Sequence, residues 1–212
     1  MSIDAFQGPQ FTASPLLREM LDADPFNQFE IWYKEAEAKV SGYASPMTLA
    51  ACGNDGQPIA RTVLLKGVSP EGFCFYTNYQ SRKAQQLEQN PKASLCLFWE
   101  ELERQVLILG SVVKMTAEES DAYFASRPRG SQLGAHVSQQ SQEIASRATL
   151  EYELTRIEEK VADTEVSRPE HWGGYRLVPS SIEFWQGQPD RLHDRFIYEK
   201  SDQGWSIKRL AP

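Results

Sequence analysis

The spacing of apolar residues along the chain predicts where helices and strands lie. After Asp24 and Pro25, apolar side chains recur at positions 26, 29, 33, 36 and 40, which is the spacing of one face of an α-helix. Asp24 is a favoured N-cap residue, and Pro25 is favoured in the first turn. The pattern therefore predicts an amphipathic helix that starts at Asp24 and ends near Gly42.

Short apolar runs separated by turn residues follow this helix. They predict strands over residues 47–52, 59–68, 73–77, 93–99 and 105–115. Ser81 can cap a short helix over residues 82–89, which Asn90-Pro91 ends. Short strands joined by turns favour an antiparallel barrel or sandwich over repeated βαβ units.

Further helices and a second group of strands make up the rest of the chain. Thr116 and Glu119 have the spacing of a capping box, which predicts a helix over residues 117–126. Helical spacing predicts another helix over residues 149–162, and residues 132–137 are expected to form a helical turn. The final predicted strands are residues 175–178, 182–186, 195–198 and 205–210. Because strands return after the helices, we expect them to complete the first sheet.

This order of elements predicts a mainly β protein with flanking α-helices (α+β). We expect one domain over residues 21–212, without internal repeats or a low-complexity linker. Residues 1–20 show little periodicity and contain Pro9 and Pro15, so we expect a mobile N-terminal arm.

The composition is typical of a soluble globular protein. Of the 212 residues, 41% are hydrophobic and 24% are charged. No apolar run approaches the ~18 residues of a transmembrane helix. The N-terminus lacks the basic start and apolar core of a signal peptide, so we expect a cytoplasmic protein without a membrane partner. The net charge of −7 argues against a dedicated nucleic-acid-binding protein.

Missing motifs exclude several catalytic classes. Cys52, Cys74 and Cys96 form no C-x-x-C pair, and no H-E-x-x-H motif occurs, so we expect no metal centre. The sequence also lacks a P-loop, a G-x-G-x-x-G dinucleotide motif and a G-x-S-x-G nucleophile elbow. The chemistry is therefore expected to use another kind of site.

Basic residues gather in one stretch of this acidic chain. Arg61, Lys66, Arg82 and Lys83 are opposed there only by Glu71, which gives a local charge of +3. Such an excess favours a small anionic ligand, with phosphate the commonest case. An ordinary fluctuation of charge along the chain explains the count equally well.

The same stretch contains a change from strand to helix. Tyr76 and Thr77 end a predicted strand, and Ser81 then opens a helix whose first residues are Arg82 and Lys83. Free backbone N–H groups, the helix dipole and two cationic side chains would together form a phosphate cradle. The alternative is a surface helix start with two solvated basic side chains.

Polar residues elsewhere could complete such a site. Gln105 can both donate a hydrogen bond to the edge of a heterocycle and accept one from it. Tyr123, Arg127 and Ser131 lie at steps of four residues and could hold a second phosphate. Each of these signals, taken alone, is also consistent with an ordinary solvated surface.

The last cluster lies near the C-terminus. Arg191, His193 and Arg195 alternate, which on an extended chain would place three cationic or polar groups on one face. Such a face is unfavourable unless it meets water or an anion. Trp185, in a predicted strand just before the cluster, is by itself typical of a core residue.

Taken together, these clusters give the sequence a close resemblance to the pyridoxine (pyridoxamine) 5′-phosphate oxidase family over about residues 24–212. The motifs that carry it are RTVLLK (61–66), FYTNYQSRKAQQLEQNP (75–91), LERQV (102–106), YFASRPRGSQLGAHVSQQS (123–141), WGGYRL (172–177), EFWQG (183–187), RLHDRFIYE (191–199) and RLAP (209–212). Any one motif is weak, but their occurrence in this order is specific.

The resemblance implies an FMN-binding split β-barrel that forms a homodimer, with FMN bound across the subunit interface. The implied FMN contacts are Arg61, Thr62, Val63, Leu64, Leu65, Lys66, Tyr76, Thr77, Arg82, Lys83, Gln105, Gln140, Ser141, Trp185 and Arg195. The implied substrate contacts are Lys66, Tyr123, Arg127, Ser131, Arg191 and His193. We expect Arg191 and His193 to act in the chemical step.

The implied reaction is the oxidation of pyridoxine 5′-phosphate and pyridoxamine 5′-phosphate to pyridoxal 5′-phosphate. FMN takes the hydride, dioxygen is the final acceptor and hydrogen peroxide is the product. Two alternatives stay open: a split-barrel protein that binds flavin without catalysis, and a diverged flavin oxidase such as a phenazine-pathway enzyme. Family members often carry a basic N-terminal stretch that can fold over the site, whereas residues 1–15 here contain neither Lys nor Arg.

Overall fold

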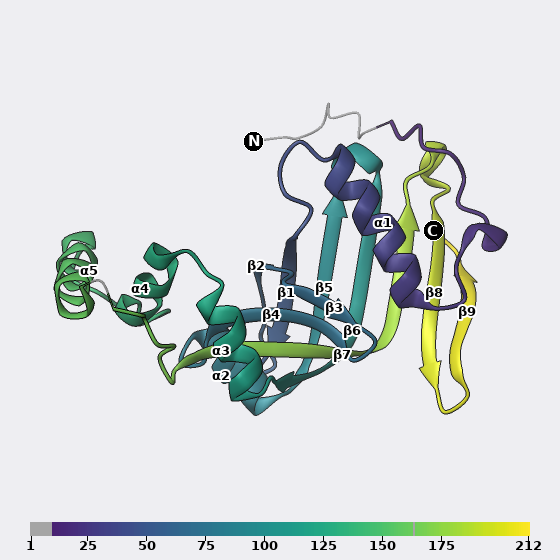
Figure 1. Ribbon diagram of the computed structural model, residues 1–212. Helices are drawn as coiled ribbons and strands as arrows, with labels where there is room; N and C mark the ends of the chain where they lie inside the picture. Colours follow the sequence, from purple (N-terminus) through teal and green to yellow (C-terminus); the bar gives the residue numbers. More distant parts are fainter. Residues whose placement is uncertain (1–9, 163) are drawn as a thin grey trace, which may run out of the picture. The chain divides into compact units, whose positions relative to one another are not determined.

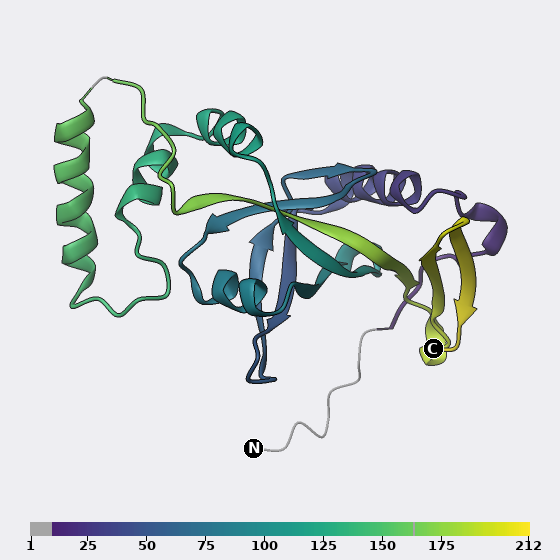
Figure 2. The same cartoon turned by 90° about the horizontal axis from the view of Figure 1, so that it is seen from below.

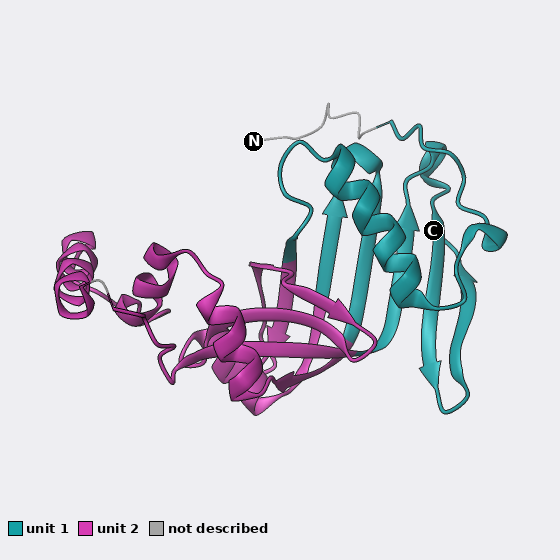
Figure 3. Ribbon diagram, in the orientation of Figure 1, with its two compact units in different colours: residues 1–47, 95–109, 179–212 teal, residues 48–94, 110–178 magenta. Residues whose placement is uncertain are grey.

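The computed structural model describes residues 10–162 and 164–212. These residues form two compact units, coloured teal and magenta in Figure 3. Unit 1 contains the described residues up to Met47, with Leu95–Leu109 and Pro179–Pro212. Unit 2 contains Thr48–Ser94 and Gly110–Val178. A single domain over residues 21–212 stays a prediction.

The chain alternates between helices and strands in the order shown in Figure 1. The α-helices are α1 (Pro25–Lys39), α2 (Arg82–Gln89), α3 (Ala117–Ala125), α4 (Arg129–Val137) and α5 (Arg147–Val161). The strands are β1 (Pro46–Cys52), β2 (Pro58–Leu64), β3 (Gly67–Ser69), β4 (Gly72–Asn78), β5 (Lys92–Trp99), β6 (Arg104–Lys114), β7 (Trp172–Gln186), β8 (Asp194–Ser201) and β9 (Gly204–Leu210). Short 3-10 helices lie at η1 (Arg18–Met20), η2 (Glu100–Leu102) and η3 (Pro189–Arg191).

Hydrogen bonds connect the strands in the order β2-β1-β5-β6-β7-β4-β3, with β8 paired to β7 and β9 paired to β8. β4 runs antiparallel to β3 and β7, and β8 runs antiparallel to β7 and β9. β1, β5, β6 and β7 contribute residues to both units. The predicted class, mainly β with flanking helices, is therefore confirmed.

The local signals in the sequence locate the starts of α1, α2 and α3 correctly. The Asp24 carboxylate accepts a hydrogen bond from the backbone N–H of Phe26 at 2.8 Å, and α1 begins at Pro25. Ser81 caps α2, and Thr116 and Glu119 form the predicted capping box of α3. These caps depend only on residues three or fewer positions away, so the sequence is sufficient to predict them.

Where the structure differs from the prediction, strand partners decide the outcome. The strand predicted over residues 59–68 is broken at Leu65 and Lys66, because the Lys66 N–H donates to the Cys74 carbonyl of β4 and the chain leaves its pairing with β1. Conversely, residues 175–178 and 182–186 belong to one strand, β7, which continues through Pro179. The helix predicted over residues 132–137 starts earlier, at Arg129.

The core of unit 1 forms where α1 packs on the strands (Figure 1). Trp32 of α1 meets Phe184 of β7 edge to face at 5.1 Å between ring centroids. The Arg104 guanidinium carbon of β6 lies 4.4 Å from the centroid of the Trp32 ring. The same guanidinium forms a 2.7 Å ion pair with Glu35 of α1. Apolar packing and one shared cation therefore hold α1 in place.

The segment before α1 is attached to unit 1 by backbone hydrogen bonds. The N–H groups of Thr12 and Ala13 donate to the Glu103 carboxylate, and the Leu16 N–H donates to the Asp194 carboxylate at 2.9 Å. Residues 10–20 of the predicted arm therefore have defined contacts. Residues 1–9 of that arm lie outside the described residues.

Unit 2 is built around the antiparallel pair β4–β7. Figure 2 shows α2 and α3 on opposite sides of this pair, and α5 packs against α4. Tyr76 of β4 lies opposite Gly174 of β7, and a Cβ on Gly174 would approach a Tyr76 ring carbon to 2.9 Å. The glycine therefore allows the tyrosine ring to lie flat on β7.

No helix in the described ranges is long and apolar enough to cross a membrane.

We predict that Gly110→Ala destabilises the protein. A Cβ on Gly110 would overlap the Val178 carbonyl oxygen and lie 2.8 Å from a methyl carbon of Leu177, so β6 and β7 would have to separate. Overpacking of this kind costs about 1–3 kcal/mol. The melting temperature should fall by roughly 2–12 °C in a thermal scan.

Gly130→Ala in α4 is the control, because a Cβ there has nothing within 4 Å. It should leave the melting temperature unchanged or raise it slightly, since alanine favours helix. Equal melting temperatures for the Gly110 variant and the wild type would contradict the predicted clash.

Candidate functional site

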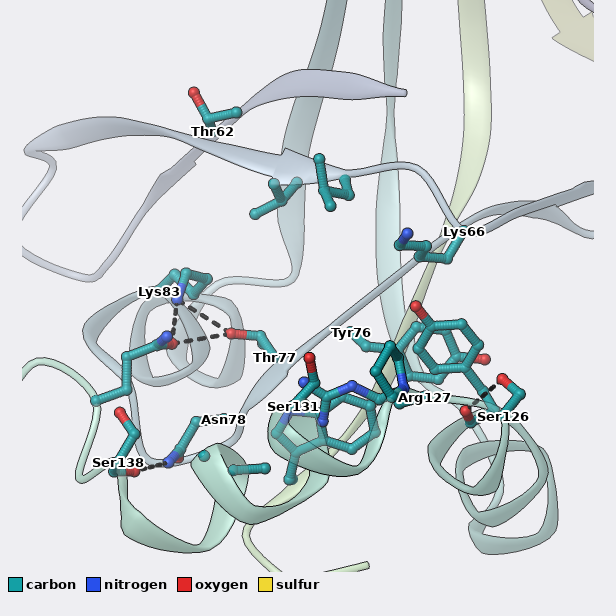
Figure 4. A pocket seen from close by; sticks show the side chains of 18 residues that line it. Thr62, Lys66, Tyr76, Thr77, Asn78, Lys83, Ser126, Arg127, Ser131 and Ser138 are labelled. Carbon is teal, nitrogen blue, oxygen red and sulfur yellow. Dashed lines mark hydrogen bonds between the residues drawn. The ribbon is translucent and has the colours of Figure 1, made fainter. Parts of the chain in front are cut away.

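A cavity of about 760 Å³ lies in unit 2. It is lined by the end of β2, the β2–β3 connection, β4, α2, the α3–α4 region and the start of β7 (Figure 4). The predicted site residues that line it are Thr62, Val63, Leu64, Lys66, Tyr76, Thr77, Lys83, Tyr123, Arg127, Ser131 and Gln140. The structure therefore brings together most of the predicted residues that belong to unit 2.

Lys83 carries the positive charge at one side of the cavity (Figure 4). Its Nζ donates to the Thr77 hydroxyl at 3.0 Å, the Ser81 hydroxyl at 3.3 Å and the Gln140 amide oxygen at 2.6 Å. These partners are all neutral. Burial, and secondarily the charge of Arg61, lowers the pKa of Lys83 to about 8. An anion bound at this point would restore the ordinary charged state.

Two more cations accompany Lys83. Arg61 donates to the Gln86 amide oxygen at 2.7 Å, and its pKa is lowered by burial and by the positive charge of Arg82. The Arg82 backbone N–H, in the first turn of α2, donates to the Ser141 hydroxyl at 3.2 Å. Within the described ranges, none of these cations forms an ion pair with a carboxylate. Their donors fit a phosphate, as the sequence predicts.

Arg127 and Lys66 lie at the other side of the cavity (Figure 4). The Arg127 guanidinium carbon is 4.5 Å from the centroid of the Trp172 ring and 5.5 Å from that of Phe124. Burial lowers the pKa of Arg127, and its Nη1 is buried without a hydrogen-bond partner. A buried guanidinium with an unused donor suits a second anion.

Aromatic rings line the cavity next to Arg127. The Tyr76 and Tyr123 rings are stacked with centroids 3.8 Å apart, and the Trp172 ring is nearly parallel to both. Burial raises the pKa of Tyr76 to about 12, so its hydroxyl stays protonated near neutral pH. The cavity thus offers flat apolar surfaces between two cationic regions, which fits planar, phosphorylated ligands.

Other predicted unit 2 residues lie around this cavity without lining it. Leu65, in the connection between β2 and β3, is 5% exposed and does not line the cavity. Arg61 lies close enough to Lys83 and to Arg82 for their charges to interact, and Ser141 contacts the start of α2.

The remaining predicted residues belong to unit 1: Gln105, Trp185, Arg191, His193 and Arg195. The Trp185 and His193 rings lie 4.8 Å apart, and Phe11 packs edge to face on both. Arg191 and His193 line a second cavity of about 660 Å³, together with residues 10–12. Gln105 lies half-buried in β6.

Arg191, His193 and Arg195 do not alternate along one strand, so that prediction is wrong. Arg191 ends η3 with a φ of 61°, and β8 begins only at Asp194. The Arg195 side chain forms an ion pair with Glu183, with N–O distances of 2.8 and 3.1 Å. Pro189 and the turn that follows it interrupt the extended chain, which the spacing alone did not indicate.

The α3–α4 region also differs in local structure from the prediction. α3 ends at Ala125, so Arg127 lies beyond the helix that contains Tyr123. Both still line the same cavity with Ser131. Residues that line it without having been predicted are Asn78, Ser126, Pro128, Gly134, Ala135, Ser138 and Trp172. For Trp172 the signal was present, since the WGGYRL motif begins there.

Comparisons with known proteins agree with this geometry. Residues 34–160 match the model of the pyridoxamine 5′-phosphate oxidase family, and residues 172–212 match that of the pyridoxine 5′-phosphate oxidase C-terminal dimerisation region. A pyridoxine/pyridoxamine 5′-phosphate oxidase of Burkholderia lata is 55% identical over 192 residues, covering 89% of each chain. One of Acaryochloris marina is 52% identical over 197 residues, covering 93% of this chain and 90% of the relative.

Solved structures give the same fold. PhzG from Burkholderia lata, in complex with tetrahydrophenazine-1-carboxylic acid, superposes with a TM-score of 0.88 at 28% identity and covers 94% of this chain and 99% of its own. A pyridoxamine 5′-phosphate oxidase-related, FMN-binding protein from Nostoc punctiforme superposes with a TM-score of 0.71 at 18% identity, covering 91% of this chain and 100% of its own. The second likeness concerns the fold alone.

The resemblance inferred from the sequence motifs is therefore confirmed. The match to a dimerisation region supports a homodimer, and the family supports FMN as the cofactor of a flavin-dependent oxidoreductase. Two family models and relatives above 50% identity lead to one conclusion: the chain belongs to the pyridoxamine 5′-phosphate oxidase family.

Proposed function

We propose that the protein oxidises pyridoxine 5′-phosphate and pyridoxamine 5′-phosphate to pyridoxal 5′-phosphate, with dioxygen as the electron acceptor and hydrogen peroxide as product. The observation that carries the proposal is the cavity of unit 2, which has two separate cationic regions joined by aromatic surface. FMN and the substrate each bring one phosphate and one planar ring. The names of relatives at 52–55% identity support the same reaction.

The cationic region around Lys83 is assigned to the FMN phosphate. Arg61, Arg82 and Lys83 supply charge, and the first turn of α2 supplies backbone N–H groups. Gln140 contacts the Lys83 ammonium, and Ser141 contacts the Arg82 backbone N–H. When bound, FMN supplies the group that accepts a hydride. The full set of proposed contacts is Arg61, Thr62, Val63, Leu64, Leu65, Lys66, Tyr76, Thr77, Arg82, Lys83, Gln105, Gln140, Ser141, Trp185 and Arg195.

The other cationic region is assigned to the substrate phosphate. Arg127 and Lys66 supply charge, and Tyr123 and Ser131 supply hydroxyl groups. The substrate phosphate does not change during the reaction, so these residues bind substrate and transition state about equally. Arg191 and His193 are assigned to the pyridine ring, where the His193 imidazole can donate or accept a hydrogen bond.

The proposed site uses residues of both units. Gln105, Trp185, Arg191, His193 and Arg195 belong to unit 1, whereas the cavity with the two cationic regions belongs to unit 2. We propose that FMN binds across the interface of a homodimer. The match of residues 172–212 to a dimerisation region supports this arrangement.

A phenazine-pathway oxidase is the second candidate function, because the structure of PhzG superposes with a TM-score of 0.88. The identity to PhzG is 28%, compared with 55% to the pyridoxine/pyridoxamine 5′-phosphate oxidase of the same organism. The second cationic region, with an unused Arg127 donor, also suits a phosphorylated substrate. We therefore favour the vitamin B6 substrates.

Peroxide formation by the FMN-loaded protein tests the proposal. Pyridoxine 5′-phosphate and pyridoxamine 5′-phosphate should both yield stoichiometric hydrogen peroxide and pyridoxal 5′-phosphate, and the amine should also release ammonia. Unphosphorylated pyridoxine is the control and should react far more slowly. Failure with both phosphates would overturn the proposed reaction, and turnover of tetrahydrophenazine-1-carboxylic acid instead would establish the second candidate.

We predict that FMN affinity falls as the pH rises through about 8. The free protein holds Lys83 with a pKa near this value, and a bound phosphate must raise it. Above that pH, binding requires uptake of a proton, so the association constant should fall by up to about tenfold per pH unit. Below it Lys83 is already charged, and this contribution is flat.

Lys83→Arg is the matched control, because arginine keeps its charge over this range. Fluorescence titration of the apoprotein at several pH values should show the decline in the wild type and its loss in the variant. The same slope in both proteins would assign the pH dependence to another group.

We predict that Arg127→Ala and Arg191→Ala have different kinetic effects. Arg127→Ala should mainly raise KM, because it removes binding that is uniform along the reaction. Arg191→Ala should also lower kcat by about tenfold or more, which corresponds to about 1.4 kcal/mol of lost transition-state stabilisation. FMN content should stay at the wild-type level in both variants.

Rapid mixing without oxygen isolates flavin reduction from reoxidation. His193→Ala should slow this step together with Arg191→Ala. If both variants reduce the flavin at the wild-type rate once saturated with substrate, Arg191 and His193 only bind the substrate.

A further inference from the structure

Trp172 lies beneath the cation of the substrate-phosphate region, although the sequence analysis did not include it in the site. It is the first residue of β7, and its side chain is 7% exposed. The Arg127 guanidinium carbon lies 4.5 Å from the centroid of its ring. The indole ring therefore offers its face, where the π-electron density is highest, to a buried cation.

Few contacts restrain Arg127 apart from aromatic rings. Its Nη1 has no hydrogen-bond partner, and within the described ranges it forms no ion pair. The Phe124 ring is the other aromatic contact, at 5.5 Å. A guanidinium stacked on a ring keeps its N–H groups in a plane parallel to that ring, so they remain available to a phosphate.

Trp172 itself is held from several directions. Its carbonyl accepts a 2.7 Å hydrogen bond from Arg168, which also forms a 2.6 Å ion pair with Asp121. Its N–H donates to the Pro169 carbonyl at 3.0 Å, and its position in β7 is opposite Asn78 of β4. The tryptophan is thus a fixed platform under a cation that has little else to hold it.

We propose that Trp172 is a positioning residue for the substrate phosphate, acting through Arg127. The indole face fixes the plane of the guanidinium beside the cavity that Arg127 lines. The near-parallel rings of Tyr76 and Tyr123 extend the same platform toward the substrate. This inference rests on the proposed function and names the residue that makes its phosphate region specific.

A purely structural role is the competing explanation. Trp172 belongs to an apolar cluster with Phe124, Leu133, Ala135 and Val166. Its loss could therefore loosen the cluster and weaken every ligand equally. A positioning role instead predicts an effect confined to ligands that carry a phosphate.

Calorimetric titration of the FMN-loaded protein with pyridoxal 5′-phosphate and with pyridoxal separates these roles. The dissociation constant of pyridoxal divided by that of pyridoxal 5′-phosphate measures what the phosphate contributes to affinity. Trp172→Leu should reduce this ratio about tenfold, in the range of a desolvated cation–π contact. Trp172→Phe, which keeps a ring face, should retain most of it.

Val166→Ala is the control for the cluster. Val166 is buried in the same cluster, but it has no contact with the Arg127 guanidinium among those described. The variant should lower the melting temperature and leave the ratio at the wild-type value. If it changes the ratio as much as Trp172→Leu does, Trp172 acts only as a core residue.

A double-mutant cycle completes the test. In an Arg127→Met background, Trp172→Leu should have no further effect on the ratio, because the cation it positions is gone. Additive effects would overturn the proposal, as would a wild-type protein that binds both ligands equally. These measurements need no turnover, so they remain interpretable if peroxide assays reject the proposed reaction.

Discussion

The antiparallel pairing of β4 with β7 is the contact on which the cavity of unit 2 depends. It sets Tyr76 opposite Gly174 and Asn78 opposite Trp172, so the aromatic surface and the platform beneath Arg127 come from one register. The same strand, β4, leads directly into Ser81 and the first turn of α2. A slip of one residue in this register would turn Tyr76 to the other face of the sheet, and the aromatic surface between the two cationic regions would be lost.

Among the described residues, the cationic side chains in and around the cavity have no carboxylate partner. Lys83, Arg61 and Arg127 all have their pKa lowered by burial, and their described partners are neutral groups. Burying unpaired cations is unfavourable, so the protein without ligands gives up stability in these places. Phosphate groups relieve this, and ligand binding therefore also stabilises the fold. Arg195, by contrast, has a neighbouring carboxylate in Glu183.

Local chemistry determined which features the sequence could predict. The caps at Asp24, Ser81 and Thr116 involve neighbouring residues, so they followed directly from the pattern. The break at Leu65 depends on a contact with β4, which lies later in the sequence, so the local pattern does not indicate it. The turn at Arg191 depends on a positive φ, which the spacing of the residues does not reveal. Basic residues and a helix start indicated the phosphate region around Lys83, whereas the full set of site positions came from the family motifs.

The discontinuous make-up of unit 1 has a consequence for synthesis on the ribosome. Trp32 of α1 packs against Phe184, and the Tyr198 hydroxyl donates to the Asp22 carbonyl, so α1 finds these partners only near the end of translation. At about 5–20 residues per second, some 150 residues take roughly 8–30 s to emerge. Unit 2 is complete at Val178, before those partners of α1 appear. During that interval the nascent chain can cover α1 only in part, through the contacts of Phe29 and Tyr33 with the earlier Trp99.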